Sequence, residues 1–353
     1  MADRHSAADL TAFAAALLSK AGLDAEKAKT TAEVLVEGDL MGHSTHGLQL
    51  LGPYLVEIEA GRMTKTGEPT VIAERPATLT WDGRYLPGPW LVLKAIDAAI
   101  AKAKTHGTGT VVIAHSHHIA CLAAYPLRAI ERGMAVLVAS SDPASGSVAP
   151  YGAIVGRYTP NPLAGGWPVQ DGKGEPVIFD VSASTTTNGM VARLNRTGGK
   201  LGGLWLVDNK GNATDDPKSF TADPPGAVLP LGGMDLGHKG FALGLLVEML
   251  TSGLGGAGRA QGSKQWGARV FIQVLDPAAF GGLEAFTTET GWIADACRTA
   301  PVKPGNPPVR LPGERGLKLR RQQQAEGVTL HPEIMPSLKP WAEKLGIAVP
   351  KTL

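Results

Sequence analysis

The sequence has few cysteines, no long apolar run and almost no net charge. Two cysteines, Cys121 and Cys297, occur in 353 residues without a C-x-x-C pattern, which argues against a disulfide scaffold and favours a reducing compartment. The longest apolar run, Phe241–Val247, stops at Glu248, far short of the ~18 residues that a membrane span needs. The opening MADRHSAADL is charged and has no signal-peptide core. We therefore expect a cytoplasmic protein that makes no membrane contact.

The net charge is +2, from 34 Lys and Arg against 32 Asp and Glu. Nucleic-acid-binding domains usually carry clustered basic residues, so we expect a small-molecule partner and no nucleic acid. The sequence also contains no Walker phosphate loop. Gly253–Gly258 matches G-x-G-x-x-G, but a helical pattern precedes it where the dinucleotide fingerprint needs a strand. A nicotinamide enzyme with the usual Rossmann fingerprint is therefore excluded.

Apolar periodicity predicts a layered α/β fold in three parts. Residues 1–75 are expected to form a helical N-terminal region, and residues 76–314 an α/β core that binds the cofactor. Residues 315–353 are expected to return as a tail onto the first helices. The expected strands of the core are Thr78–Trp81, Thr110–Ala114, Ala135–Ser140, Pro176–Ser182, Leu204–Asp208 and Arg269–Asp276. The expected helices between them are Leu91–Lys104, Ala120–Arg132 and Gly240–Leu254.

Histidine, the side chain best suited to proton transfer near neutral pH, is concentrated in three short segments. These segments contain His43 and His46, then His115, His117 and His118, and finally His238. The middle group follows the apolar run Val111–Ala114, and open α/β sheets place active sites just past the carboxyl ends of strands. We expect a catalytic base here. The alternatives are a metal site built from the three histidines, or structural histidines held by hydrogen bonds.

Three further segments allow either a functional or a structural role. Thr45-His46-Gly47 lies where a helix is expected to end, so His46 has a functional role or Gly47 simply caps the helix. Ser140–Pro143 follows an apolar strand and is either a ligand contact or a plain turn. Asp180 lies inside an apolar strand, where an unpaired carboxylate is costly. It is therefore part of a buried structural pair, or it contacts cofactor or substrate.

Lys239 precedes a helix that is expected to begin near Gly240. A cation at a helix N-terminus opposes the helix dipole, so this placement favours a bound phosphate or carboxylate over an exposed lysine. Three basic residues after Asp180 could contact the 2′-phosphate of a cofactor, although a solvated loop explains them as well. They are Arg193, Arg196 and Lys200.

Several of these segments, in order, resemble the malate/L-lactate dehydrogenase-type oxidoreductases that lack a Rossmann fold. That family includes sulfolactate and ureidoglycolate dehydrogenases and piperideine-2-carboxylate reductases. Each motif is weak alone, but their order and spacing together are specific. The matching segments are Gly42–Tyr54, Ser116–Ala120, Ser141–Pro143 with Val148–Gly152, Asn161–Ala164, Pro176–Ser182, Leu229–Gly233 with His238–Phe241, and Leu311–Glu314.

The resemblance implies an α/β fold with a mixed sheet, a homodimer, and oxidation of 2-hydroxy acids with NAD or NADP, or the reverse reduction. Cyclic imino acids belong to the same substrate range. It further implies that His118 is the acid/base and His46 its partner at the substrate, with Thr45 and His117 also binding substrate. The cofactor-binding positions that it implies are Ser141, Asp180, Lys239, Gly240, Pro312 and Gly313.

The sequence departs from the family pattern at the substrate. Leu50 stands where many members have an arginine that grips the substrate carboxylate, and Met190 stands where a lysine is common. Thr45 replaces a serine. Loss of the arginine removes a charge-assisted contact, so the carboxylate is held differently or the substrate is neither lactate nor malate. Two alternatives to the dehydrogenase remain: a metal-dependent hydrolase using the His115–His118 segment, and a non-catalytic ligand-binding relative.

Overall fold

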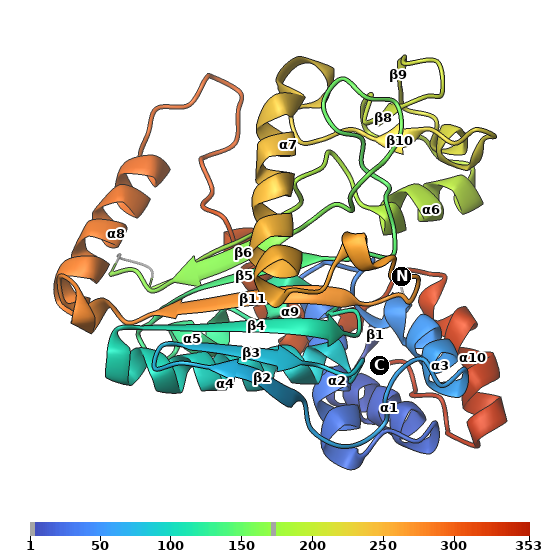
Figure 1. Cartoon of the computed structure of the whole chain (residues 1–353), viewed down its shortest axis with the longest axis horizontal. Coiled ribbons are helices and arrows are strands. Elements are labelled where there is room, and N and C mark those ends of the chain that lie inside the picture. Colours follow the sequence, from blue (N-terminus) through green and yellow to red (C-terminus); the bar gives the residue numbers. More distant parts are fainter. Residues whose placement is uncertain (1–3, 171–173) are drawn as a thin grey trace.

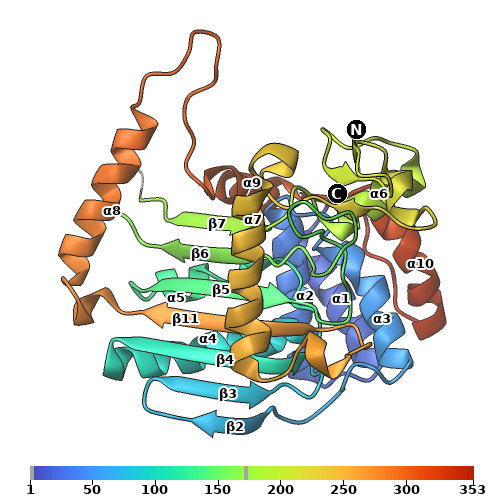
Figure 2. The same ribbon diagram turned by 45° about the horizontal axis from the view of Figure 1, so that its top comes forward.

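A seven-stranded sheet forms the centre of the computed structural model, which describes residues 4–170 and 174–353. Only β3 and β4 pair in parallel, while the other neighbours run antiparallel (Figure 2). The sheet is therefore mixed, which confirms the expected non-Rossmann architecture. The strands, in spatial order, are β2 (Thr70–Glu74), β3 (Thr78–Asp82), β4 (Thr108–Ser116), β11 (Ala268–Leu275), β5 (Ala135–Ser141), β6 (Leu163–Trp167) and β7 (Val177–Val181).

Helices cover both faces of this sheet, and the apolar run of β4 shows why. Val111 and Ile113 belong to the main core beneath the sheet, where α4 (Gly88–His106) packs. Val112 points the other way, into a cluster with Val247 of α7 (Gly233–Glu248). A strand that is buried on both faces reads as a continuous hydrophobic run rather than an alternating one. Figure 1 shows α7 standing over the sheet and α4 lying below it.

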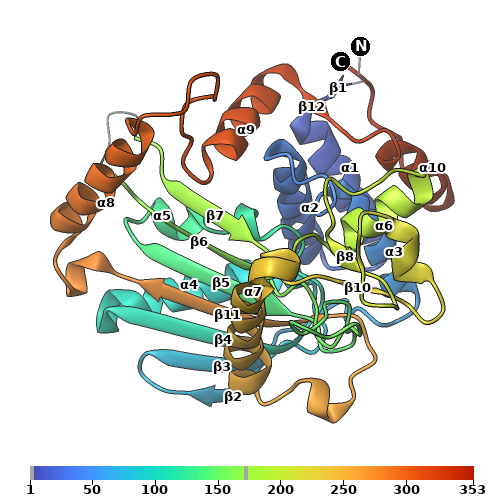
Figure 3. The same cartoon turned by 90° about the horizontal axis from the view of Figure 1, so that it is seen from above.

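The N-terminal helices pack against the segments after residue 314. Helix α1 (Ala7–Lys20) begins at Ser6, whose hydroxyl accepts from the backbone N–H of Asp9. Strand β1 (Arg4–His5) pairs with β12 (Val328–Thr329), so the two ends of the chain meet (Figure 3). The other elements of this region are α2 (Ala25–Leu40), η1 (Leu48–Leu50), α3 (Leu51–Glu59), α9 (Glu314–Glu326) and α10 (Ile334–Leu345).

A smaller layer lies over one end of the large sheet and is built around a three-stranded sheet of order β10-β8-β9. It consists of α6 (Asn188–Thr197), β8 (Leu206–Val207), β9 (Ala213–Thr214), η3 (Pro217–Thr221) and β10 (Ala227–Val228). Helix α8 stands apart at the other end of the sheet (Figure 1). The remaining elements are η2 (Leu122–Ala124), α5 (Leu127–Ile130), the π-helical η4 (Met249–Gly253), η5 (Arg259–Gln261), η6 (Pro277–Ala279) and α8 (Leu283–Arg298).

Two expected helices are wrong in extent. The helix expected to begin near Gly240 begins at Gly233, so Lys239 lies inside α7 instead of before it. Gly232 and Gly233 both have positive φ, and this pair sets the start of the helix. The helix expected over 120–132 is reduced to the short elements η2 and α5 around Pro126, which has no N–H to donate. Within the described residues, no helix is long and apolar enough to cross a bilayer.

Candidate active site

A cavity of about 670 Å³ opens at the edge of the sheet where β4, β5 and β7 end. The loop after α2, the start of α6 and the segment before β11 complete its walls. Five of the expected site residues line it together: Thr45, His46, His118, Ser141 and Asp180. They come from distant parts of the chain: the ends of β4, β5 and β7 lie at one edge of the mixed sheet, and the loop after α2 adds Thr45 and His46. Other lining residues are His43, Leu50, Ile119, Cys121, Asp142, Asn161, Asn188, Met190, Trp205 and Trp266.

His118 is fixed through one ring nitrogen. Its Nδ1 lies 2.9 Å from the hydroxyl oxygen of Tyr54 and accepts from the backbone N–H of Ala120 at 3.2 Å. Because a backbone N–H can only donate, Nδ1 carries the lone pair in this arrangement and the neutral ring holds its proton on Nε2. Burial lowers the pKa of His118 well below its usual value, and His46 and His117 act in the same direction. The ring is therefore neutral near pH 7.

His46 lies beside His118, with 6.1 Å between the ring centroids. Its Nδ1 is 2.8 Å from the hydroxyl of Thr45, so the two residues form one polar unit in the wall. Burial lowers the pKa of His46 to about 4, with smaller effects from His43 and Arg193. Two neutral imidazoles therefore line the cavity at neutral pH. Each ring is uncharged before proton transfer and has one N–H donor and one nitrogen acceptor.

The loop that carries Thr45 and His46 is held by Asp39 of α2. The Asp39 carboxylate accepts from the backbone N–H of Leu48 at 2.7 Å. Gly47 lies directly over this carboxylate, because a Cβ at Gly47 would be 2.4 Å from it. The helix-cap explanation of Gly47 is wrong, since the left-handed glycine after α2 is Gly42, with φ 84°. Glycine is required at position 47 because the backbone there lies against the Asp39 carboxylate and leaves no room for a Cβ.

The His115–His118 segment does not gather into one metal site. His115 Nδ1 lies 3.2 Å from Asp82, and His117 is fully buried with its Nε2 3.7 Å from Glu57. His117 does not line the cavity and instead packs its ring against Tyr54 and Trp266. Within the described parts of the chain, the group with metal-ligand spacing is a different one: His43, Cys121 and Asp180, whose ligand atoms lie within 4.8 Å of one another.

Asp180 is held on β7 by the backbone N–H of Ala123, at 2.9 Å, and its Oδ2 lies 4.0 Å from the Cys121 thiol. Burial raises the pKa of Asp180, while His43 and the Ala123 N–H lower it. Asp180 does not form the buried structural ion pair that was one of its two expected roles, because its contacts are a backbone amide and a thiol rather than a cation. The other expected role, a contact with cofactor or substrate, stays a prediction. The carboxylate thus lines the cavity with remaining capacity to accept hydrogen bonds.

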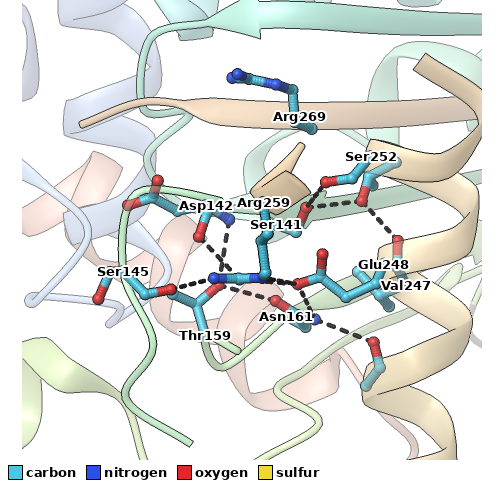
Figure 4. A network of polar contacts seen from close by, with 12 residues as sticks. Ser141, Asp142, Ser145, Thr159, Asn161, Val247, Glu248, Ser252, Arg259 and Arg269 are labelled. Carbon is cyan, nitrogen blue, oxygen red and sulfur yellow. Dashed lines mark hydrogen bonds and ion pairs between the residues drawn. The ribbon is translucent and has the colours of Figure 1, made fainter. Parts of the chain in front are cut away.

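A polar network fixes the wall around Ser141 and Asn161 (Figure 4). The Ser141 hydroxyl lies 2.7 Å from that of Thr251 and 3.2 Å from that of Ser252, which ties β5 to the π-helical turn η4. The Asn161 amide donates to Glu248 and to the backbone of α7. Arg259 closes the network, donating to Glu248 and to the carbonyls of Asp142 and Ser145. These contacts rigidify the β5 end of the cavity.

The remaining expected cofactor residues lie outside the cavity lining. Lys239 is exposed on α7. Gly240 lies where α7 meets the preceding loop, because a Cβ there would be 2.3 Å from the backbone N of Leu231. Gly313 packs against β7, and Pro312 accepts from the backbone N–H of Ile178 at 3.2 Å. Close packing alone explains both glycines, so a role in cofactor binding stays a prediction for all four residues.

The three basic residues after β7 have separate surroundings. Arg193 is 7% exposed and donates to Ser44 at 3.1 Å and to Gln49, so it joins α6 to the His46 loop. Arg196 pairs with Glu333 of α10, and Lys200 pairs with Asp215. Arg193 therefore belongs neither to a cluster around a 2′-phosphate nor to a solvated loop, because its side chain is buried between α6 and the loop that carries His46.

Sequence reasoning assigned no role to Tyr54 or Trp266. Tyr54 is fully buried on α3, contacts His118 Nδ1 and also donates to the His118 carbonyl at 3.1 Å. Trp266 precedes β11, and its ring lies 5.0 Å from that of His118. Tyr54 was visible within a family motif, but its hydroxyl could have been placed only from the contact between α3 and the end of β4. Trp266 carried no signal in the sequence.

The fold and cavity together define a class: a layered α/β enzyme with a mixed sheet and two buried histidines at the strand ends. A family model described as malate/L-lactate dehydrogenase matches residues 5–339. The chain therefore belongs to the malate/L-lactate dehydrogenase family and is an oxidoreductase, as the sequence motifs predict.

Relatives match along nearly the whole chain. An L-lactate dehydrogenase from Cupriavidus necator is 29% identical, covering 95% of each chain. A Delta(1)-pyrroline-2-carboxylate reductase from Ancylobacter novellus is 30% identical, covering 93% of this chain and 94% of its own. Among solved structures, a malate dehydrogenase from Entamoeba histolytica superposes with a TM-score of 0.91 at 26% identity, over 99% of this chain and 100% of its own. The relatives thus include proteins named for hydroxy acids and for a cyclic imino acid.

Proposed function

We propose that the protein transfers a hydride between NAD or NADP and a small 2-hydroxy or 2-oxo acid, or a cyclic imino acid, with His118 as the acid/base. The observation that carries this proposal is the geometry of His118. Its ring lines the cavity beside His46, while Tyr54 and Ala120 occupy Nδ1 and leave Nε2 for a substrate. Names of the relatives, which include dehydrogenases and an imino-acid reductase, support the substrate range.

His118 handles the proton in both directions. In reduction, the ring first carries a proton on both nitrogens, donates Nε2–H to the oxygen or nitrogen that becomes protonated, and is left neutral. In oxidation, Nε2 must offer a lone pair, and the ring proton then lies on Nδ1. For this tautomer the contact of the Ala120 N–H with Nδ1 at 3.2 Å must open, and the Tyr54 oxygen accepts the Nδ1 proton while the Tyr54 hydroxyl proton points to the His118 carbonyl. His46 and Thr45 orient the substrate next to this ring. Tyr54 therefore supports either tautomer of His118.

Part of the polar lining of the cavity is free to contact a nicotinamide group or its ribose. Asn188 lines the cavity and its Oδ1, a hydrogen-bond acceptor, is buried without a partner among the described residues, whereas the amide of Asn161 already donates to Gly244 and Glu248. The Asp180 carboxylate can accept from ribose or carboxamide. Lys239, Gly240 and the Pro312–Gly313 turn are proposed to bind the rest of the cofactor. When bound, the cofactor supplies or accepts the hydride.

We propose that the working form is a homodimer in a reducing, cytosolic setting. Both cysteines are unpaired. The dimer would bury exposed apolar side chains along α7, where Leu236, Leu243 and Leu246 are 51%, 39% and 41% exposed. Contiguous apolar patches on a soluble protein mark interaction surfaces.

The deciding experiment is a titration of the purified protein with NADH and with NADPH. Trp266 and Trp205 line the cavity, so binding should quench tryptophan fluorescence and raise the melting temperature. Trp266→Phe should reduce the quench, whereas Trp292→Phe, at a 68% exposed position on α8, should leave it unchanged. Saturable binding of one cofactor supports the proposal and selects NAD or NADP. If neither NADH nor NADPH binds, the proposed hydride transfer is contradicted, and the alternative of a non-catalytic ligand-binding relative is favoured.

A further inference from the structure

Three side chains of the kinds that bind metal ions meet in the cavity wall, and the proposed hydride transfer uses only one of them. They are His43, Cys121 and Asp180, and one ligand atom of each lies within 4.8 Å of the other two. All three line the cavity. They come from separate segments: the loop after α2, the residue before η2, and strand β7. The fold, and not proximity in the sequence, brings this cluster together.

Hydrogen bonds and turn geometry hold the three residues in place. The backbone N–H of His43 donates to the carbonyl of Gly38 at 2.8 Å, and the N–H of Ala123 donates to the Asp180 carboxylate at 2.9 Å. Cys121 is the N-cap residue of η2, and its thiol lies 4.0 Å from Asp180 Oδ2. Contacts of this kind around the ligands orient them and strengthen metal binding. The cluster is therefore largely formed before any ion binds.

The spacing of the cluster suits a small tetrahedral ion. Zinc binds imidazole, thiolate and carboxylate at about 2.0–2.3 Å, which places neighbouring ligand atoms about 3.3–3.7 Å apart. The thiol and the carboxylate, at 4.0 Å, are close to this range. Even a separation of 4.8 Å closes with about 1 Å of side-chain movement. Calcium and magnesium prefer oxygen ligands, whereas a set that contains thiolate and imidazole selects zinc.

The charges of the cluster favour a divalent cation. Burial raises the pKa of the Cys121 thiol well above its usual value, and Asp180 adds to this effect, while the backbone N–H groups of Ala123 and Ala124 oppose it. A thiolate next to a carboxylate is therefore costly without a cation between them. When zinc binds, it replaces the thiol proton, which passes to solvent, and its two positive charges compensate the thiolate and the carboxylate.

We propose that His43, Cys121 and Asp180 bind one zinc ion per chain, with the fourth coordination position open to the cavity. All three ligands belong to one chain, so each copy in an oligomer carries its own site. Three protein ligands with one open position are typical of an accessible zinc site and not of a closed structural one. The consequence of the site rests on the proposed hydride transfer. Zinc occupies the Asp180 carboxylate that we assign to the cofactor, so zinc and cofactor exclude each other.

The test of the site uses Co²⁺, which occupies zinc sites and gives a charge-transfer absorption band with a thiolate ligand. Titration of the reduced, cofactor-free protein should produce this band with one Co²⁺ per chain, and Zn²⁺ should abolish it by displacement. Cys121→Ser should remove the band, whereas Cys297→Ser, which changes the exposed cysteine on α8, should leave it in place. A band that survives Cys121→Ser, or no band in the parent protein, overturns the inference. If Cys121→Ser does not fold, His43→Gln decides instead, because it should weaken Co²⁺ binding at least about tenfold.

Cofactor binding tests the consequence of the site separately. Quenching of Trp205 and Trp266 gives the Kd for NADH or NADPH with and without Zn²⁺. In the parent protein and in Cys297→Ser, zinc at about ten times its own Kd should raise the apparent Kd for cofactor roughly tenfold, and in Cys121→Ser it should not. An unchanged Kd in the zinc-saturated parent protein overturns the competition. If neither cofactor binds even without zinc, the proposed hydride transfer fails, and the Co²⁺ band still decides the metal site.

Discussion

At the scale of single residues, the site depends on how its histidines are held. His118 contributes one ring nitrogen to Tyr54 and Ala120 and leaves the other for chemistry, so its role is set by neighbours that are distant in sequence. The two ring nitrogens of His117, one residue earlier, have no hydrogen-bond partner among the described residues. Two adjacent histidines thus have different surroundings just after the end of β4. His118 lines the cavity, whereas His117 is buried in the core.

Replacing His118 by Ala removes the proposed acid/base. We expect kcat to fall by about 10²–10⁴, the usual contribution of a positioned proton-transfer group. Cofactor binding, followed by tryptophan fluorescence, should persist because the side chain is only one part of the cavity wall. Steady-state rates with the best 2-oxo or imino acid give the measurement. Unchanged kcat in a folded His118→Ala protein would remove His118 from the mechanism.

Tyr54→Phe tests the contact that orients His118. Deleting the hydroxyl removes a partner of Nδ1 at 2.9 Å, and the ring then loses its proton acceptor in the oxidation direction. We expect kcat for oxidation to fall by roughly tenfold, the effect of losing about 1.4 kcal/mol, while the KM for cofactor stays constant. The pH profile of kcat should shift as well. An equal rise in KM for cofactor would point to general disruption of the site instead.

His117 makes folding sensitive to acid. Burial lowers its pKa from 6.5 to about 4, so the unfolded chain binds the proton more readily between these values. Its stabilising contribution is complete above pH 6.5 and is lost as the pH falls toward 4, amounting to about 2 kcal/mol between pH 7 and pH 5. His117→Phe should therefore flatten the decline in unfolding free energy measured with urea at the two pH values.

The control is His106→Phe, at an exposed position in the last turn of α4, which should leave the decline unchanged. His46 and His118 are buried in the same way and contribute with the same sign. If His117→Phe and the parent protein lose stability equally between pH 7 and pH 5, His117 is not the group responsible.

At the scale of elements, apolar periodicity predicted helices and strands whose burial leaves a regular pattern. It missed the helix boundaries that depend on glycine and proline. Strands β3, β4, β5, β7 and β11 and helix α4 were recognisable, because burial on one or both faces leaves a continuous or periodic apolar pattern, whereas β2 and β6 were not expected. The start of α7 was not, since Gly232 and Gly233 read as chain breakers although they form the N-terminal boundary of the helix. The histidines at the end of β4 followed from strand position, whereas Tyr54 and Trp266 required knowledge of which elements meet.

The start of α4 presses against the His117–His118 backbone. A Cβ at Gly88 would lie 2.4 Å from the carbonyl oxygens of both histidines, so only glycine fits. Gly88→Ala should lower the unfolding free energy by about 1–3 kcal/mol and reduce kcat, because the segment that carries His118 must move. Thermal melts and rates provide both readouts. Gly281→Ala, where nothing lies within 4 Å, is the matched control and should change neither.

At the scale of the whole molecule, the exposed side chains of α7 and α8 are the feature that a single chain leaves unexplained. Leu243, Leu246 and Met249 recur at helical spacing on α7 and η4, and they are 39%, 41% and 49% exposed. Trp292 on α8 is 68% exposed. Because α7 also anchors Asn161 and Arg259 through Glu248, burying its outer face against a second copy would stabilise the wall of the cavity.

The double variant Leu243→Asp/Leu246→Asp should convert the proposed dimer into a monomer. Two carboxylates per chain place four buried, unpaired carboxylates at a symmetric dimer interface, and the cost of their desolvation outweighs association. Light scattering after size-exclusion chromatography measures the mass, and kcat measured alongside reports on the cavity wall. Ile72→Asp on β2, at a 56% exposed position on the edge strand, is the control for added surface charge. If Ile72→Asp dissociates the protein and the α7 variant does not, the interface lies at the sheet edge and α7 needs another explanation.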